Sequence, residues 1–448
     1  MGSSLLVCGG SIVTAKGVRR ADVRITDGLV AEVDYELPRR TDDAHPKEQI
    51  LDASGKLVFP GLIDPQVHFR EPGLTHKEDL ASGSLAAVAG GVTSLMEMPN
   101  TRPATTNPEA LTDKLTRARG RMHTDHAFFL GATSENADQL GEWEQLPGCC
   151  GVKVFMGSST GDLLVADDPT IERVLRSGER RVAVHSEDEP RLRERYAAIE
   201  PGTTVVDHPD VRDVETAVRA TRRLLDLVER TRRKVHVLHL STAEEVALLR
   251  ERDLGDLVTA EVTPNHLCLT APDCYERFGA HAQMNPPVRD ARHRDALREA
   301  LANGTIACIG SDHAPHTAEE KAQTYPASPA GIPGVQTILP LLLTAVRDGW
   351  LQLTDVARVT TSGPAAVYGI AGKGSFEPGA DGDLVIVDPD VDSPLEAEWL
   401  QSRAGWSPYV GVELAGLPIT TVLRGSIVFN NGAPTAAAGE PLRFDCNR

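Results

Sequence analysis

The chain has 448 residues, of which 41% are hydrophobic and 25% charged, enough for one large core with a smaller appended unit. Its formal net charge of −18 argues against nucleic acid or an anionic membrane surface as a partner. No apolar run approaches the roughly 18 to 20 residues that span a bilayer, and residues 1–15 lack the pattern of a signal peptide. We therefore expect a cytoplasmic location. The seven cysteines are scattered and include no CxxC pair, which favours reduced thiols over disulfides.

The first 58 residues have the pattern of short strands and hairpins. Alternating apolar residues occupy 5–7, 11–14, 21–25 and 29–33, and Asp27-Gly28 separates the last two runs. We therefore expect a small β unit at the start of the chain.

From Pro60 onward the pattern changes to strand, loop and helix. Strands are expected near 57–67, 92–98, 126–131, 151–156, 181–186, 234–240, 257–263 and 305–311. Helical patterns fill most gaps, for example at 169–176, 214–230, 243–252 and 292–302. The pattern Thr75-His-Lys-Glu78 predicts a capping box at the start of the first helix. Eight such strands predict an α/β fold with a closed, TIM-like (β/α)8 barrel, which we assign to residues 59–369.

The last part of the chain returns to short strands. After helices expected near 335–347 and 354–368, strands are predicted at 383–388 and 420–429, with Asn431-Gly432 as a turn and a loose tail after Asn430. Because the two β-rich ends flank the barrel, we expect residues 1–58 and 370–448 to form one composite β-sandwich domain.

Polar side chains follow or interrupt five of the predicted barrel strands. These residues are His68, Lys153, His185, His239 and Asp312. Each has a structural interpretation when taken alone, such as a salt bridge for Lys153. Because the carboxyl ends of barrel strands meet, we expect the five to lie together. Imidazoles and a carboxylate suit Zn²⁺ or a similar divalent ion, which acidifies a bound water and polarises a carbonyl. We expect His236 to face the other way and to be structural.

The sequence resembles the cyclic amidohydrolases and, within them, the dihydroorotases. The resemblance covers nearly the whole chain. Eight fragments in the right order carry it: PGLIDPQVHFREPG, EMPNTRPATT, GVKVFMGSSTGDLLV, VAVHSEDE, VHVLHLSTAEE, MNPPVRD, GSDHAPHT and SPYVGVELAGLPITTVLRG.

The resemblance implies a two-metal centre. We expect one or two Zn²⁺ ions per chain. It assigns Lys153, carboxylated by CO₂, to the bridge between the metals, His185 and His239 to one metal, and His68 and Asp312 to the other. Asp312 is then also the general base and proton shuttle for a metal-activated hydroxide that attacks the ring amide. The implied reaction interconverts (S)-dihydroorotate and N-carbamoyl-L-aspartate in pyrimidine biosynthesis, in a homodimer or higher homo-oligomer.

The resemblance also implies the substrate contacts. Arg70, Asn100 and His316 match the positions that bind the dihydroorotate carboxylate, and Asn285 matches a position that contacts the ring. A planar guanidinium suits a carboxylate. The Gly- and Pro-rich loop at 328–334 either covers the bound substrate or connects two elements.

Two positions depart from the family pattern. Gln66 stands in place of the first metal-binding His, and Asn265 stands where some relatives carry His. An amide oxygen is a weaker zinc ligand than imidazole. Three outcomes stay open: one tight and one weak metal, a mononuclear enzyme, or an inactive dihydroorotase-like scaffold for aspartate transcarbamoylase. A further alternative is a hydrolase or cyclase of another acidic cyclic amide or ureide, like a hydantoinase or allantoinase.

Overall fold

The computed structural model describes residues 3–40, 48–159, 161 and 163–445. Three sheets organise that part of the chain, and the central one has eight parallel strands. Each central strand lies beside its neighbour in the sequence. The strands are β8 (Leu62–Val67), β9 (Val92–Glu97), β10 (Asp125–Gly131), β11 (Cys149–Phe155), β12 (Val182–His185), β13 (Val235–Val237), β14 (Val258–Val262) and β15 (Cys308–Ile309).

The first and last strands of the central sheet meet just beyond their carboxyl ends. Val67 and His313 form a parallel bridge, and His68 N–H donates to the His313 carbonyl at 2.8 Å. All residues of β8 and β11 are buried, because one face of such a strand meets the interior and the other meets helices. The predicted (β/α)8 barrel is confirmed.

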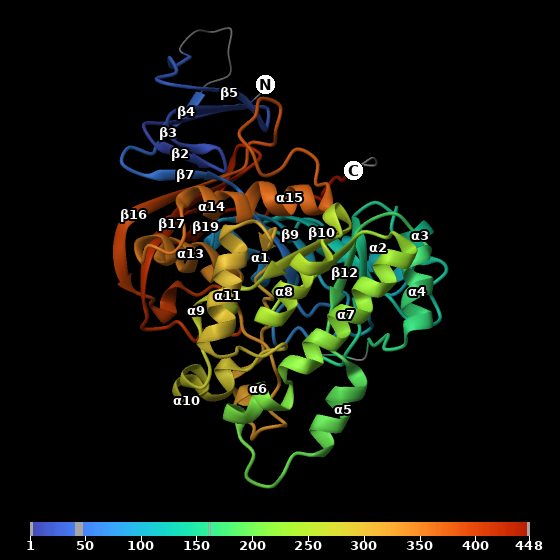
Figure 1. Cartoon of the computed structure of the whole chain (residues 1–448). Helices are drawn as coiled ribbons and strands as arrows, with labels where there is room; N and C mark the ends of the chain where they lie inside the picture. The colour runs from blue at the N-terminus through green and yellow to red at the C-terminus, as the bar shows by residue number, and fades with distance from the viewer. Residues whose placement is uncertain (1–2, 41–47, 160, 162, 446–448) are drawn as a thin grey trace.

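Helices surround the barrel (Figure 1). The longer ones are α1 (Leu80–Ala89), α2 (Pro108–Ala118), α4 (Asp168–Arg176), α5 (Glu189–Ala197), α7 (Val214–Thr231), α8 (Ala243–Arg252), α11 (Ala291–Ala302) and α13 (Ile338–Arg347). Shorter ones are α3 (Leu140–Trp143), α6 (His208–Val211), α9 (Pro264–Cys268), α10 (Asp273–Phe278), α12 (Ala318–Lys321), α14 (Leu353–Ala357) and α15 (Gly363–Tyr368). Among the described residues, no helix combines the length and apolar character that crossing a membrane requires.

The first barrel helix begins later than the sequence pattern predicts. The expected capping box over residues 75–78 is wrong, since Asp79 is the N-cap of α1 and accepts from Ser82 N–H at 2.9 Å. Glu78 is buried instead and accepts from Arg403 N–H at 3.2 Å. A contact with a distant segment therefore overrides the local pattern.

A second sheet joins the two ends of the chain. Its order is β19-β18-β17-β16-β7-β2-β3. Its strands are β2 (Ser11–Thr14), β3 (Gly17–Arg20), β7 (Leu57–Pro60), β16 (Leu384–Pro394), β17 (Glu413–Leu423), β18 (Ser426–Asn430) and β19 (Ala433–Pro434). The antiparallel pairing of β7 with β16 confirms the composite β unit, and Figure 1 shows blue β2, β3 and β7 beside red β16 and β17.

The third sheet comes from the N-terminal segment and packs on the second. It contains β1 (Ser4–Cys8), β4 (Asp22–Thr26), β5 (Leu29–Asp34) and β6 (Glu48–Asp52). Buried apolar residues of both sheets, including Leu5, Ile25 and Ile386, share one cluster. The two sheets make the sandwich beside the barrel.

The C-terminal segment differs from the prediction in two ways. The single strand expected at 420–429 is two strands, because Arg424 and Gly425 both take positive φ, 43° and 72°, and turn the chain. The loose tail is also wrong for the described residues after Asn430. Leu442 is buried and its N–H donates to the His126 carbonyl at 2.8 Å, so this segment packs on the barrel.

Candidate active site

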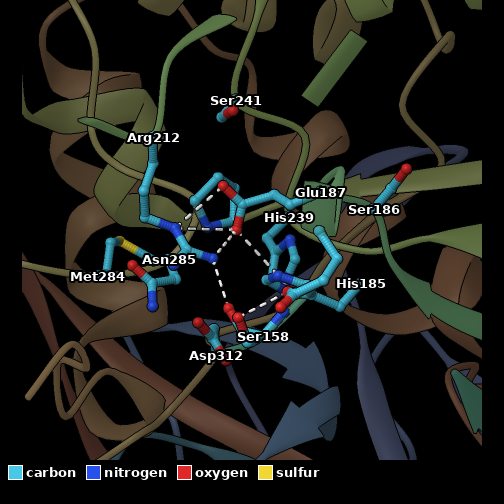
Figure 2. A network of polar contacts seen from close by, with 12 residues as sticks. Ser158, His185, Ser186, Glu187, Arg212, His239, Ser241, Met284, Asn285 and Asp312 are labelled. Carbon is cyan, nitrogen blue, oxygen red and sulfur yellow. Dashed lines mark hydrogen bonds and ion pairs between the residues drawn. The ribbon is translucent and has the colours of Figure 1, made fainter. Parts of the chain in front are cut away.

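Six barrel strands bring polar side chains to one small cavity at their carboxyl ends. The cavity has a volume of about 20 Å³. Its lining includes Gln66, His68, Arg70, Asn100, Lys153, His185, His239, Asn285 and Asp312. The structure thus brings together every predicted site residue except His316, which lies behind the wall, 3.3 Å from Arg70. Figure 2 shows several of these side chains pointing toward one another.

Two histidines converge on one side of the cavity. His185 is the last residue of β12, and His239 follows β13 by two residues. His185 Nδ1 and His239 Nε2 face each other at 3.0 Å. Burial is the main cause that lowers the pKa of both imidazoles, so both are neutral and able to offer a lone pair. Two imidazole nitrogens placed in this way suit a shared cation.

A second group converges on Asp312 Oδ1 from β8. His68 Nε2 lies 3.1 Å from this oxygen, and Gln66 Nε2 donates to it at 3.0 Å. His68 Nδ1 lies 2.7 Å from Asn100 Oδ1, which accepts its proton. The lone pair of Nε2 therefore faces a carboxylate oxygen. Gln66 Oε1 is buried without a hydrogen-bond partner in the described structure. The His68 Nε2 lone pair, Asp312 Oδ1 and Gln66 Oε1 are acceptors that lie close together. A bound cation would stabilise this arrangement.

Backbone strain accompanies three of the cavity residues. Arg70, His239 and Asp312 have φ values of 66°, 36° and 48°, in the left-handed region. Side chains other than glycine rarely adopt this conformation, and it is retained where the surrounding structure enforces it, often at functional sites. The strained residues lie just after β8, β13 and β15, where the chain leaves the barrel.

Lys153 is a buried amine that has no hydrogen-bonded partner among the described residues. Its exposed fraction is 1%, and its Nζ lies 4.5 Å from the centre of the Phe155 ring. No hydrogen bond or salt bridge of Nζ forms with the described residues. Burial lowers the pKa of Lys153 to about 7, against the attraction of Asp312 and Glu261. The amine is therefore substantially neutral, and hence nucleophilic, near physiological pH.

An ion pair behind His185 was not predicted from the sequence. Glu187 Oε2 lies 2.9 Å from His185 Nε2, and Arg212 Nε donates to Glu187 Oε1 at 3.1 Å (Figure 2). Burial opposes ionisation, but Arg212 and His185 outweigh it and hold the pKa of the Glu187 carboxyl well below its usual range. The charge of this carboxylate favours the tautomer with the proton on Nε2 and the Nδ1 lone pair directed to a cation, although the 2.9 Å contact lacks hydrogen-bond geometry in the described structure. The signal was the spacing of Glu187, two residues after His185.

The same arginine ties this pair to a loop at the cavity. Arg212 Nη2 donates to the Ser158 carbonyl at 2.8 Å, and the next residue, Ser159, lines the cavity. Ser158 Oγ in turn donates to Glu189 at 2.7 Å. The loop after β11 is thus held against the histidine side of the site.

His236 and Asn265 both lie outside the cavity. His236 lies inside the barrel, contrary to the expectation that it faces outward, because its Nε2 contacts Glu261 at 3.1 Å and its ring packs on Tyr368. It is fully buried and lies outside the cavity lining. Asn265 is also absent from that lining, and its Oδ1 accepts from Tyr409 Oη at 2.8 Å.

The remaining wall of the cavity carries the groups expected to contact substrate. Arg70 is buried, its Nε donates to the Pro315 carbonyl at 3.2 Å, and its Nη1 has no partner among the described residues. Asn285 Oδ1 lies 3.1 Å from His208 Nε2 on α6, a partner the sequence did not reveal. The 328–334 loop contributes Ala330 and Gly331 to the lining.

Comparison with known families gives two matches along the chain. The model of the amidohydrolase family matches residues 168–428, and a dihydro-orotase-like model matches residues 55–142. The two matches together include all the predicted site residues except Lys153.

Similar proteins include enzymes with different named substrates. A dihydroorotase of Methanosarcina acetivorans is 36% identical over 94% of this chain and 91% of its own length. An allantoinase of Rubrobacter xylanophilus is 36% identical over 96% of this chain and 94% of its own length. Among solved structures, the L-hydantoinase (dihydropyrimidinase) from Arthrobacter aurescens superimposes with a TM-score of 0.90 at 29% identity, covering 99% of this chain and 100% of that one.

Proposed function

Because this chain belongs to the amidohydrolase family, we propose that its reaction is that of a dihydroorotase. The enzyme is a hydrolase of cyclic amides, and the proposed reaction interconverts (S)-dihydroorotate and N-carbamoyl-L-aspartate in pyrimidine biosynthesis. The observation that carries the choice of substrate is the buried guanidinium of Arg70, whose Nη1 lacks a protein acceptor within the described structure. A buried cation with a spare donor requires an anion, and dihydroorotate supplies a ring carboxylate.

The residues of the cavity fit divalent metal ions. His185 and His239 would hold one ion, and His68 with Asp312 would hold the other, with Gln66 as a weak neutral neighbour whose Oε1 has no other partner in the described structure. Their nitrogen and oxygen donors suit Zn²⁺. Bound ions would acidify a water molecule and polarise the ring carbonyl.

Lys153 would bridge the two ions as a carbamate. Its neutral amine would attack the carbon of CO₂, so that a C–N bond forms, one C=O π bond opens to give a carboxylate oxygen, and the nitrogen loses one proton to water. The carbamate of Lys153 would offer two oxygens as metal ligands, whereas the unmodified side chain offers one nitrogen. The burial of Nζ and its lack of hydrogen bonds in the described structure support this modification, because they favour the neutral amine.

Asp312 would carry the proton of the reaction. Its Oδ1 lies at the convergence of His68 and Gln66, where it would accept a proton from water and deliver it to the departing ring nitrogen. In the reverse direction the same oxygen would take the proton from the attacking carbamoyl nitrogen. Asn285, held by His208, would contact the ring.

Arg70 and Asn100 would receive the substrate carboxylate, and His316 would support Arg70. Arg70 and Asn100 line the cavity, and His316 contacts Arg70 from behind. This set favours a ring with a carboxylate over a neutral ring, because a neutral ring leaves Nη1 of the buried guanidinium, which has no acceptor among the described residues, without a hydrogen bond.

The proposal extends to the organisation of the protein. We assign residues 59–369 to the catalytic domain and residues 1–58 with 370–448 to the sandwich domain. We expect a cytoplasmic homodimer or higher homo-oligomer, with aspartate transcarbamoylase as a candidate partner. An inactive scaffold for that enzyme is the opposing hypothesis, and the complete set of convergent donors favours activity.

A ureide or hydantoin ring is the second candidate substrate. This chain is 36% identical to an allantoinase and also 36% identical to a dihydroorotase. The equal identity supports a ureide ring as an alternative substrate. The test is a panel of kcat/KM values for dihydroorotate, hydantoin, allantoin and dihydrouracil on one preparation supplied with Zn²⁺ and bicarbonate. We expect dihydroorotate to be preferred. A higher kcat/KM for any of the other three would assign the enzyme to that ring instead.

A further inference from the structure

Two cationic side chains contact the imidazole of His316 from opposite sides. Lys77 Nζ lies 3.1 Å from His316 Nδ1, and Arg70 Nη2 lies 3.3 Å from His316 Nε2. Nε2 also lies 3.1 Å from the Ala330 carbonyl oxygen in the cavity wall. The Lys77 side chain is 12% exposed, so this contact is largely shielded from water.

The hydrogen-bond chemistry of these groups favours one tautomer of His316. A lysine ammonium only donates, and Lys77 Nζ at 3.1 Å lies nearer to Nδ1 than the acceptor Glu320 Oε2 at 3.4 Å, so Nδ1 accepts from Lys77. A neutral imidazole has one proton, which is then on Nε2 and donates to the Ala330 carbonyl. Burial, together with Arg70 and Lys77, lowers the pKa of His316, which agrees with a neutral ring.

This tautomer decides what Arg70 can bind. In the tautomer with the proton on Nε2, this nitrogen cannot accept a hydrogen bond from Arg70 Nη2, although the two atoms lie 3.3 Å apart. Nη1 has no partner among the described residues either. Both terminal nitrogens of this guanidinium therefore stay available, and they form the fork that a carboxylate fits.

Without Lys77 the ring has a competing arrangement. Glu320 Oε2 lies 3.4 Å from His316 Nδ1 and would accept a proton from it. The lone pair would then be on Nε2 and would accept from Arg70 Nη2. In this tautomer Arg70 Nη2 would donate to His316 instead of the substrate carboxylate. His316 Nε2 would also no longer donate to the Ala330 carbonyl.

We propose that Lys77 is a specificity-determining residue that, through Nδ1 of His316, keeps both terminal nitrogens of Arg70 available for a carboxylate on the substrate ring. The inference rests on the proposed function, since it concerns an anionic ring substrate. It gives Lys77 a role through other residues, because Lys77 itself is absent from the cavity lining.

A neighbouring arginine provides a matched control. Lys77 and Arg102 both line an outer pocket of about 580 Å³ that shares Asn100 with the inner cavity. Arg102 is exposed, and its guanidinium makes no hydrogen bond to His316 in the described structure. Arg102→Met therefore removes a nearby positive charge without changing the tautomer.

The experiment compares Lys77→Met, Lys77→Arg and Arg102→Met with the parent enzyme. For Lys77→Met we expect KM for dihydroorotate to rise about tenfold, the effect of one hydrogen bond to a charged group. We expect KM for dihydrouracil, which lacks the carboxylate, to stay unchanged. Lys77→Arg keeps a donor and should restore most of the affinity, and Arg102→Met should resemble the parent enzyme.

The tautomer is read separately by ¹⁵N NMR of protein labelled in histidine, with His316→Gln identifying the resonances. We expect protonation at Nε2 in the parent protein and a shift toward Nδ1 in Lys77→Met. Equal KM changes for both rings, or a parent ring protonated at Nδ1, would overturn the inference. A parent enzyme that does not turn over dihydroorotate would instead overturn the proposed function, while the NMR result would still decide the tautomer.

Discussion

At the scale of single residues, the histidine side of the cavity depends on groups one contact away from the predicted ligands. Glu187 lies between His185 and Arg212, and all three are buried. The carboxylate orients the imidazole, and the guanidinium keeps the carboxylate ionised. A partner in this position commonly changes metal affinity as much as some ligands do.

Glu187→Gln is therefore expected to weaken metal binding by about 10- to 100-fold. The amide keeps the shape of the side chain but loses the charge that holds the proton on His185 Nε2. The measurement is a competition between the protein and a chelator, followed by elemental analysis. Glu189→Gln is the matched control, because Glu189 lies close in sequence and contacts Ser158 instead of His185. Equal metal loss in both variants would contradict the role given to Glu187.

The sequence predicted which residues meet at the site but could not predict how they meet. His68, His185, His239 and Asp312 follow strand ends, so the barrel topology alone brings them together. Arg212 and Lys77 reach the site by contacts across loops, and no spacing in the sequence encodes such contacts. His236 and His239 do not lie on opposite faces as strict alternation along a strand would require, because the positive φ of His239 interrupts the strand geometry.

At the scale of elements, the 328–334 loop is fastened to the site by a buried lysine. Lys321, the last residue of α12, donates from Nζ to the carbonyls of Pro329 at 2.8 Å and Gly331 at 3.0 Å. Gly331 N–H also donates to the Gln283 carbonyl at 2.8 Å. The loop is thus tied to the segment that carries Asn285, which lies two residues after Gln283.

Lys321→Met should loosen this loop, because the carbonyls of Gln283, Pro329 and Gly331 lose this donor at once. We expect faster amide hydrogen exchange over 328–334 and a higher KM, with little change in the helices around the barrel. The exchange is followed by mass spectrometry. Glu319→Gln, an exposed change on the same short helix, should leave the exchange unaltered. Unchanged protection in Lys321→Met would show that the loop is held by other contacts.

Element boundaries were predicted best where a helix or strand is determined by its own residues. The bounds of α8 match the predicted 243–252, since Thr242 caps it and its apolar positions are periodic. The start of α1 was predicted too early because Glu78 accepts a hydrogen bond from the backbone of the distant Arg403 and does not cap the helix. The turn at Arg424 was missed because arginine rarely takes positive φ, so its identity gave no signal.

At the scale of the whole molecule, a buried charge cluster joins the barrel to the C-terminal segment. Lys373 Nζ lies 2.6 Å from Asp125 at the start of β10, and 2.9 and 2.7 Å from Asp381 and Asp383. The exposed fraction of each of these four side chains is at most 5%. The lysine compensates the charge of three carboxylates, of which Asp125 also pairs with Arg424 and Asp381 also pairs with Arg443.

Lys373→Met should lower the free energy of unfolding by about 3 to 5 kcal/mol, the cost of removing one partner from a buried ion pair. Chemical denaturation followed by circular dichroism measures it. Lys16→Met is the matched control, because Lys16 pairs with Glu377 on the surface, with exposed fractions of 85% and 69%. We expect no measurable change for that variant. Similar losses in both would refute the structural role of the cluster.

We propose that this chain is a metal-dependent dihydroorotase although Gln66 takes the place of a ligand histidine. The most direct measurement is the metal content of protein purified without chelators, with the same sample assayed for dihydroorotate hydrolysis and carbamoyl-aspartate cyclisation. We predict between one and two zinc ions per chain and turnover in both directions. Gln66→His should raise retention of the second ion, because imidazole binds zinc more tightly than an amide oxygen. Absence of both metal and turnover, even after Zn²⁺ and bicarbonate are supplied, would contradict the claim and favour the inactive scaffold.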